Sequence, residues 1–191
     1  MNISIKESKI KRMAKRCRDH YAVFNSGIAG RLIYSFFPNA ALKSLSGLPL
    51  KKDWKILDVG CGVGTLLYSL KELGFENLLG IDPYIESEIC YKNRVSILKR
   101  TIQDVDGQFN LIMFHHSFEH MEPFGVLNAV ARLIARDGFC VIRIPVADSW
   151  AWENYGINWV QIDAPRHFFL HTRKSMEIIA NKAGLNIKQV I

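Results

Sequence analysis

Apolar positions recur at two different spacings along the chain. In the first quarter they predict two helices, an amphipathic one over Ile5 to Tyr21 and an apolar one over Gly30 to Phe37. Pro38 ends the second helix, because proline cannot continue one. The segment Leu48–Asp53 then links this helical part to the rest of the chain.

From residue 55 onward, short apolar runs alternate with amphipathic stretches, a pattern typical of a parallel sheet with helices on both faces. The apolar runs predict strands at Lys55–Val59, Asn77–Ile81, Val95–Lys99, Phe109–Phe114 and Phe139–Ile144. The other stretches predict helices at Thr65–Leu73, Tyr84–Tyr91, Phe124–Arg136 and Arg173–Ala183, with Ile187–Ile191 as a sixth strand. We therefore expect an α/β fold with an open, Rossmann-like, mostly parallel sheet in residues 48–191 and a helical cap in residues 1–47.

The composition fits a folded domain, with 191 residues of which 49% are hydrophobic. No apolar run approaches the roughly 18–20 residues that a transmembrane helix needs, and the N-terminus lacks the apolar core of a secretory signal. The four cysteines form no CxxC pair, so we expect them to be reduced. These features predict a cytoplasmic protein.

The net charge of +7 is concentrated at the N-terminus. Residues 1–18 carry seven basic side chains and one acidic side chain, whereas the rest of the chain is nearly neutral. We interpret this basic arm as a solvated helix face, and binding to nucleic acid is the alternative. Nothing in the sequence indicates an oligomeric state.

A glycine loop joins the first predicted strand of the sheet to the helix that follows. Gly60, Gly62 and Gly64 let the backbone approach a ligand closely, with Cys61 between them. The spacing is GxGxG, which differs from the GxGxxG fingerprint of dinucleotide-binding proteins. Asp58 would repel a pyrophosphate but attract an ammonium group. The loop therefore predicts a zwitterionic ligand, and S-adenosylmethionine fits.

Two further strand ends supply candidate contacts to this ligand. Asp82 closes the second strand of the sheet, followed by Pro83, at the position where an acidic side chain of this fold accepts hydrogen bonds from ribose hydroxyls. A plain turn-forming role for Asp82 is the alternative. The third strand ends near residues 101–104, where we expect the amide of Ile102 or Gln103 to contact adenine, together with a side chain of Thr101, Gln103 or Asp104. A solvated loop is the alternative.

Four segments together resemble the class I S-adenosylmethionine-dependent methyltransferases: LDVGCGVGTLL, GIDP, FNLIMFHHSFEHM and LIARDGFCVIRIP. The resemblance is closest to bacterial small-molecule enzymes that act on quinone precursors or glycan sugars, and it covers Lys55 to Ile191. It implies the cofactor site named above, with His115 and His116 beside the methionine moiety. Asn110 stands where many relatives have Asp. The chain also ends before the seventh strand of that fold, so we expect it to be truncated.

Residues 116–120, His-Ser-Phe-Glu-His, also match the HxxEH spelling of inverted zinc proteases. The motif begins at the end of a buried strand beside a cofactor loop, and no downstream acidic helix offers a third ligand. We therefore expect no metal. The segment should instead line the pocket where methyl donor and acceptor meet, with a structural capping role for Glu119 and His120 as the alternative.

Residues 146–172 form a long segment rich in aromatic side chains, which we call the lid segment because such loops often close over a substrate. His167 is our first candidate for a general base, since the neighbouring charge of Arg166 would keep it neutral near pH 7. His116 and His120 are the other candidates.

The predicted activity is methyl transfer to a small hydroxylated acceptor, such as a sugar. The alternatives are an RNA or protein methyltransferase that uses the basic arm, and a module that binds the cofactor without catalysis.

Overall fold

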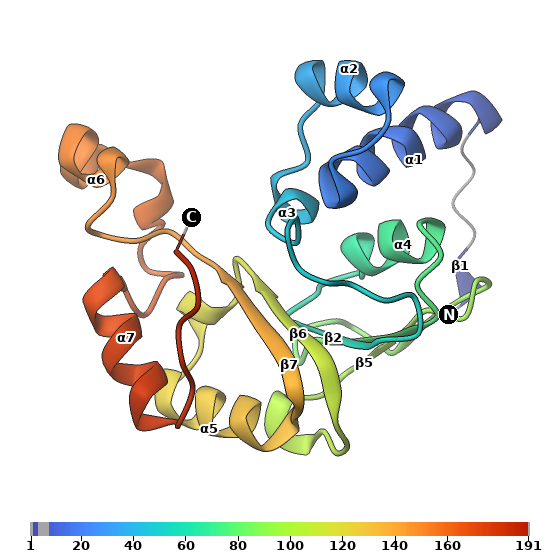
Figure 1. Ribbon diagram of the computed structural model, residues 1–191. Helices are drawn as coiled ribbons and strands as arrows, with labels where there is room; N and C mark the ends of the chain where they lie inside the picture. Colours follow the sequence, from blue (N-terminus) through green and yellow to red (C-terminus); the bar gives the residue numbers. More distant parts are fainter. Residues whose placement is uncertain (1, 4–7, 191) are drawn as a thin grey trace.

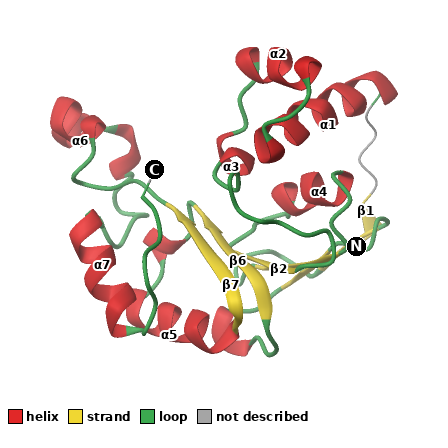
Figure 2. Cartoon of the chain, in the orientation of Figure 1, coloured by secondary structure: helices red, strands yellow, loops and turns green. Residues whose placement is uncertain are grey.

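The computed structural model describes residues 2–3 and 8–190 and contains one seven-stranded sheet (Figures 1 and 2). The strands are β1 (Asn2–Ile3), β2 (Lys55–Val59), β3 (Asn77–Ile81), β4 (Ile89–Tyr91), β5 (Ser96–Leu98), β6 (Phe109–His115) and β7 (Ile134–Arg143). Their order is β1-β4-β5-β3-β2-β6-β7, and among these described strands only the β4–β5 pair is antiparallel. The open, mostly parallel sheet is confirmed.

Helices cover both faces of this sheet, as the alternating pattern predicts (Figure 1). They are α1 (Lys9–Phe24), α2 (Ile28–Phe36), α3 (Ala40–Lys43), α4 (Thr65–Glu72), α5 (Pro123–Leu133), α6 (Trp150–Tyr155) and α7 (Arg173–Lys182). Four 3-10 turns complete the described chain: η1 (Ile102–Asp104), η2 (Phe118–His120), η3 (Gly156–Asn158) and η4 (Val160–Ile162). No helix in the described ranges combines the length and the apolar character that crossing a membrane requires.

Successive residues of the central strands point into two separate cores. Ile56 packs with residues of α1, α3 and α4, whereas Leu57 packs with residues of α5 and α7. The same alternation separates Leu111 from Ile112 on β6. Both faces of the sheet are therefore buried, and the functional groups must lie at the ends of the strands, where the chain leaves the sheet.

The N-terminal helices pack against the sheet domain through both apolar and charged contacts. Ala22 and Val23 of α1 belong to the core that α4 covers. Arg12 forms a bidentate pair with Glu72 of α4, at 2.6 and 2.7 Å, and Arg18 pairs with the buried Asp19. Two basic side chains of the arm thus form ion pairs within the chain. Two of its charged residues, Lys6 and Glu7, lie outside the described residues.

The predicted helix at Tyr84–Tyr91 is wrong. Residues 84–87 form a turn and bends, and Ile89–Tyr91 is strand β4, which pairs with β5. Ile89 and Tyr91 are buried while Cys90 is exposed, so this segment follows the two-residue period of a strand. Pairing with the edge of the sheet outweighs the local helical preference.

The end of the chain also differs from the prediction. Residues 185–190 have no regular structure, so no sixth strand forms in the described part of Ile187–Ile191, and Ile191 itself lies outside it. No described strand pairs with the outer edge of β7. Helix α5 ends at Leu133 rather than Arg136, and β7 begins at once with Ile134, which pairs with Phe109.

The lid segment contains α6, η3 and η4.

Candidate functional site

The glycine loop lies between β2 and α4, and each of its glycines has a left-handed backbone, with φ of 70° at Gly60, 54° at Gly62 and 75° at Gly64. A Cβ on Gly60 would overlap Ser117, and one on Gly64 would overlap Ile97. A Cβ on Gly62 would meet no atom within 4 Å. Two glycines thus allow the loop to pack against the protein, and the third leaves backbone facing open space, where a ligand can approach.

Asp82 fastens this loop to the end of β3. Its Oδ2 accepts a hydrogen bond from the Gly62 amide at 2.9 Å, and its Oδ1 accepts one from the Tyr84 amide at 2.8 Å. The Gly60 amide also donates to the carbonyl of Ile81. Each carboxylate oxygen retains a lone pair after these bonds, so Asp82 can still accept from a ligand hydroxyl. The turn-forming role and the proposed ligand role are therefore compatible.

Asp58 lies beneath the loop near the end of β2 and is only 3% exposed. Burial raises the pKa of its carboxyl to about 8, and the nearby charge of Asp82 adds to this effect. Burial and the same two carboxylates also raise the pKa of the Cys61 thiol. The site therefore holds two neighbouring acidic groups, and no ion pair to a cationic side chain of the described residues is seen at either, which suits a ligand with an ammonium group.

Asp58→Asn should change how stability depends on pH. The folded protein binds the Asp58 proton more tightly than the unfolded chain does, because the folded pKa is about 8 and the ordinary value is 3.8. The free energy of unfolding should therefore fall as pH rises between these values, and Asp58→Asn should remove this fall. At pH 8 we expect the variant to be more stable than the wild type by about 2 kcal/mol or more.

Denaturant unfolding at pH 5 and pH 8 measures this difference. Asp53→Asn is the matched control, because Asp53 is exposed in the turn before β2. Equal pH dependence in the wild type and Asp58→Asn would show that Asp58 ionises normally in the folded protein.

The third strand end is the turn η1, where we expected adenine contacts. Thr101 and Asp104 form a capping box, so their side chains bond to each other and to the turn. The side chain of Ile102 is buried, whereas Gln103 is exposed. The amides of Ile102 and Gln103 open the turn, where the turn itself supplies no acceptor for them. Both amides therefore stay as candidates for the contact to adenine. Because the side chains of Thr101 and Asp104 are engaged in the capping box, Gln103 is the remaining side-chain candidate.

His115 is the last residue of β6 and pairs in the sheet with Arg143 of β7. Burial lowers the pKa of its ring to about 4, with smaller contributions from the charges of Arg143 and His116, so the ring is neutral at pH 7. Neither ring nitrogen has a hydrogen-bond partner among the described residues. The next turn is fixed to the glycine loop, because Ser117 donates a hydrogen bond to the carbonyl of Val59 at 2.6 Å.

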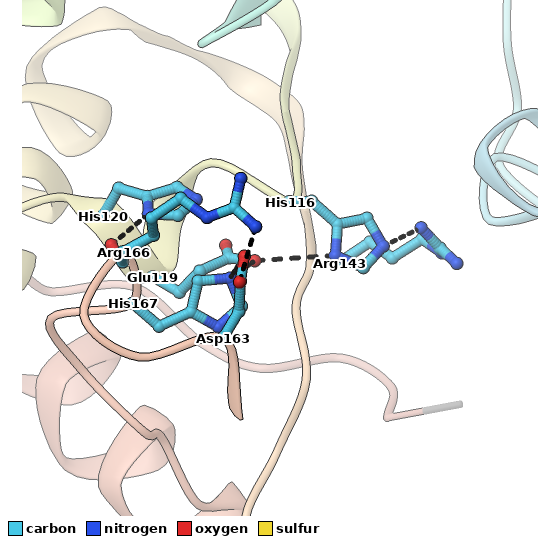
Figure 3. A network of polar contacts seen from close by, with 7 residues as sticks. All are labelled: His116, Glu119, His120, Arg143, Asp163, Arg166 and His167. Atoms are coloured by element: carbon cyan, nitrogen blue, oxygen red, sulfur yellow. Dashed lines mark hydrogen bonds and ion pairs between the residues drawn. The ribbon is translucent and has the colours of Figure 1, made fainter. Parts of the chain in front are cut away.

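A group of polar side chains, which we call the Glu119 network, connects η2, β7 and the lid segment (Figure 3). Its members are His116, Glu119, His120, Arg143, Asp163, Arg166 and His167. Glu119 is at the centre and is 0% exposed, and neither carboxylate oxygen makes a hydrogen bond within residues 2–3 and 8–190. Its Oε1 lies 3.5 Å from Nδ1 of His116 and 3.8 Å from Nε2 of His167. The capping role that we considered for the Glu119 side chain is therefore not observed.

His116 has an unusual backbone and a defined tautomer. Its φ of 54° is left-handed, a conformation that few residues with a Cβ adopt outside constrained sites. Its Nε2 contacts the Arg143 guanidinium, which can only donate, so Nε2 accepts and Nδ1 carries the proton toward Glu119. Burial and then the charge of Arg143 lower the pKa of His116, so its ring is neutral near pH 7.

The lid segment is attached to η2 at several points. The carbonyl of Glu119 accepts hydrogen bonds from the amides of Phe168 and Phe169, and Nδ1 of His120 donates to the carbonyl of Arg166 at 2.7 Å. The rings of His120 and His167 pack edge to face, with their centroids 4.8 Å apart. The predicted proximity of residues 115–120 to the lid segment is thus observed.

Our reason for choosing His167 as the base does not hold. Arg166 pairs with Asp163 at 2.6 Å, so its charge is largely neutralised, and its side chain extends into solvent. The side chain of His167 is only 6% exposed, and its Nε2 points toward Glu119 and Asp163. His116, with 40% of its side chain exposed, is better placed to meet an acceptor.

Sequence reasoning missed two residues of the site. Arg143 contacts His116, and Tyr91 donates a hydrogen bond to the carbonyl of Val63 in the glycine loop at 2.6 Å. Arg143 is the last residue of a strand in a parallel sheet, and the site lies at the edge where such strand ends meet. Its position in the sequence could therefore have identified it as a site residue. Tyr91 was hidden by the incorrect helix prediction. Asn110, the departure from the family pattern, accepts a hydrogen bond from the amide of Lys55 and so joins β6 to β2.

Residues 28–190 match the model of a protein family described as "Methyltransferase domain". No curated protein matches the chain. Solved structures provide further similarities, all at low sequence identity. The complex between the Haloferax volcanii Trm112 methyltransferase activator and a methyltransferase has a TM-score of 0.62 and 16% identity, over 97% of this chain and 80% of that one.

Two more structures share the fold. Magnesium protoporphyrin IX methyltransferase from Synechocystis, with bound S-adenosylhomocysteine, has a TM-score of 0.53 and 12% identity, over 98% of this chain and 82% of that one. YcgJ from Bacillus subtilis has a TM-score of 0.56 and 14% identity, over 71% of this chain and 63% of that one. The present chain thus spans less than two thirds of the Bacillus protein.

Proposed function

Because the chain belongs to the methyltransferase domain family, we propose that it binds S-adenosylmethionine at the glycine loop and transfers the methyl group to a small hydroxylated acceptor. The observation that carries this proposal is the open backbone at Gly62, whose amide bonds to Asp82, in a loop that also holds the buried carboxyl of Asp58 near Cys61. Such a site suits a ligand with an ammonium group and ribose hydroxyls and disfavours a pyrophosphate.

The site residues fit the parts of this cofactor in order along the strand ends. Asp58 would release its proton as it pairs with the ammonium group, whose charge favours the ionised carboxylate. Asp82 would accept from ribose hydroxyls while it keeps its bonds to the loop. The amides of Ile102 and Gln103 would contact adenine, beside Pro83. His115 would lie next to the methionine moiety, where its low pKa keeps a second positive charge away from the sulfonium. When bound, the cofactor supplies an electrophilic methyl group.

The acceptor would lie between η2 and the lid segment, with His116 as the general base. The neutral ring of His116 would take the hydroxyl proton at Nε2, once the acceptor replaces Arg143 as the partner of that nitrogen. Nδ1 of His116 faces the buried carboxylate of Glu119, which would hold the ring in position and stabilise its protonated form. Glu119 is thus a positioning residue for the base.

Asp82→Ala should weaken binding of S-adenosylhomocysteine by roughly 1.5–3 kcal/mol, the scale for hydrogen bonds to a charged group. The variant loses both the contact to ribose and the bond that holds Gly62 in place. Titration calorimetry of the wild type, Asp82→Ala and the exposed control Asp53→Ala measures this effect, with NAD titrated in parallel. Unchanged affinity of Asp82→Ala, or preference of the wild type for NAD, would contradict the proposed site.

The acceptor class is tested by following formation of S-adenosylhomocysteine with small sugars, small phenols, RNA and protein as acceptors. Turnover on a small hydroxylated compound is the expected result. Turnover on RNA that weakens steeply with salt would instead indicate that the basic arm binds the acceptor. Binding of S-adenosylhomocysteine without turnover on any acceptor class would favour the non-catalytic alternative.

A further inference from the structure

We propose that Glu119, His120 and His167 form a binding site for a divalent transition-metal ion between η2 and the lid segment, where the acceptor is proposed to bind. One possible ligand atom from each residue lies within 4.8 Å of the other two. In a tetrahedral site with ligands about 2.1 Å from the ion, the ligand atoms lie about 3.4 Å apart. A shift of each ligand atom by roughly an ångström toward a common centre would therefore bring the three into one coordination sphere.

The strongest argument is the buried carboxylate of Glu119, which has no close partner. It is completely buried, and among the described side chains its contacts are long ones, to Nδ1 of His116 at 3.5 Å and to Nε2 of His167 at 3.8 Å, with no hydrogen bond to either oxygen. A buried charge without partners is costly in free energy, and a bound cation removes that cost. The nearby guanidinium groups make their contacts elsewhere, Arg143 with His116 and Arg166 with Asp163. The carboxylate thus faces a gap in positive charge that a metal ion would fill.

His120 is prepared for coordination by its own hydrogen bond. Nδ1 bonds to the carbonyl of Arg166, which can only accept, so Nδ1 carries the proton and Nε2 presents a lone pair. A backbone carbonyl that fixes the second nitrogen is the usual arrangement behind metal-binding histidines. His167 supplies the remaining ligand, because its Nε2 faces Glu119 and the protein surrounds its ring.

These three ligands differ from those of the HxxEH motif, which we set aside because of its context and because no acidic helix downstream supplies a third ligand. The motif would use His116 and His120, whereas the structure places His167 of the lid segment beside Glu119 and His120. Nε2 of His116 already accepts from the Arg143 guanidinium. The third ligand that we could not find downstream is therefore a histidine of the lid segment.

Two imidazoles and one carboxylate suit Zn²⁺ and similar divalent ions of the first transition row. Three protein ligands leave at least one position open, as in catalytic rather than structural zinc sites. If the proposed function holds, an oxygen of the hydroxylated acceptor would occupy that position, which would favour acceptors with a second oxygen close to the methylated hydroxyl.

Metal binding is tested on the full chain without donor or acceptor. Chelator-treated protein is titrated with Zn²⁺ against a chromophoric chelator, and Co²⁺ absorption reports the coordination. We expect one equivalent to bind to the wild type and to the control His20→Ala, which removes an exposed histidine of α1. Glu119→Gln and His120→Ala should weaken binding by about 10²-fold or more, since even outer-shell partners contribute 10–100-fold.

Two results would overturn the metal site: no stoichiometric Zn²⁺ binding by the wild type, or wild-type affinity in both variants. Circular dichroism shows whether each variant is folded, and His167→Ala provides a third test of the same site. The same samples are titrated with S-adenosylhomocysteine. Binding of this ligand to protein that does not bind Zn²⁺ removes the metal site alone, whereas Zn²⁺ binding without it removes the proposed function alone.

Discussion

Gly62→Val is expected to abolish measurable binding of S-adenosylhomocysteine, a loss of at least about 10²-fold in affinity. The Cβ of Gly62 would enter the open space on the ligand side of the loop, where the methionine moiety is proposed to lie. The backbone φ of 54° adds strain for any residue with a side chain, about 1–2 kcal/mol. A branched side chain would therefore both fill the space and disturb the amide that Asp82 holds.

Gly74→Val is the control that separates occupation of the ligand space from backbone strain. Gly74 also has a left-handed backbone, with φ of 93°, and a Cβ there would likewise meet no atom within 4 Å. It lies between α4 and β3, at the opposite end of the strands from the glycine loop. Titration calorimetry should show normal binding for folded Gly74→Val and none for folded Gly62→Val. Normal binding by Gly62→Val would mean that the loop does not hold the cofactor.

His116→Ala should lower kcat by about 10²-fold or more while the affinity for S-adenosylhomocysteine stays near the wild-type value, as is typical for loss of a general base. Because the pKa of His116 is lowered, wild-type kcat should rise with pH in the acidic range and level off near pH 7. That rise should disappear in His116→Ala. Steady-state kinetics across pH, with His20→Ala as the control, measure both effects.

A different result would reassign the base. If His116→Ala keeps wild-type kcat and its pH dependence, His116 does not accept the proton. His167 and His120 then return as candidates. Loss of cofactor affinity together with turnover would instead place His116 in the cofactor pocket.

The sheet and the cofactor end of the site could be predicted because they depend on local sequence. Each of Asp58, Asp82 and His115 lies at or next to the end of a strand, and parallel strands bring such ends to one edge. The family match confirms the resemblance to methyltransferases that these residues and the glycine loop indicated. Strand β4 escaped prediction because three residues are too few to establish a two-residue period.

The acceptor end could not be predicted in the same way. Glu119 and His167 are close because the lid segment packs against η2. This packing is a long-range contact, which no local sequence pattern predicts. The pairing of Arg166 with Asp163 depends on side-chain directions within an irregular segment. Sequence proximity therefore gave the wrong electrostatic partner for His167, although it placed His167 in the correct part of the molecule.

The fit between Gly60 and Ser117 has a consequence for redesign of this protein. Gly60 and Ser117 are in close contact, and Ser117 also donates a hydrogen bond to Val59. The glycine loop and η2 therefore form one packed unit, and a substitution in either should disturb the other. Much of the lid segment, by contrast, including α6 and η3, has no buried residue. Substrate range should therefore be easiest to alter by exchanging residues 150–162, which leaves the packed unit unchanged.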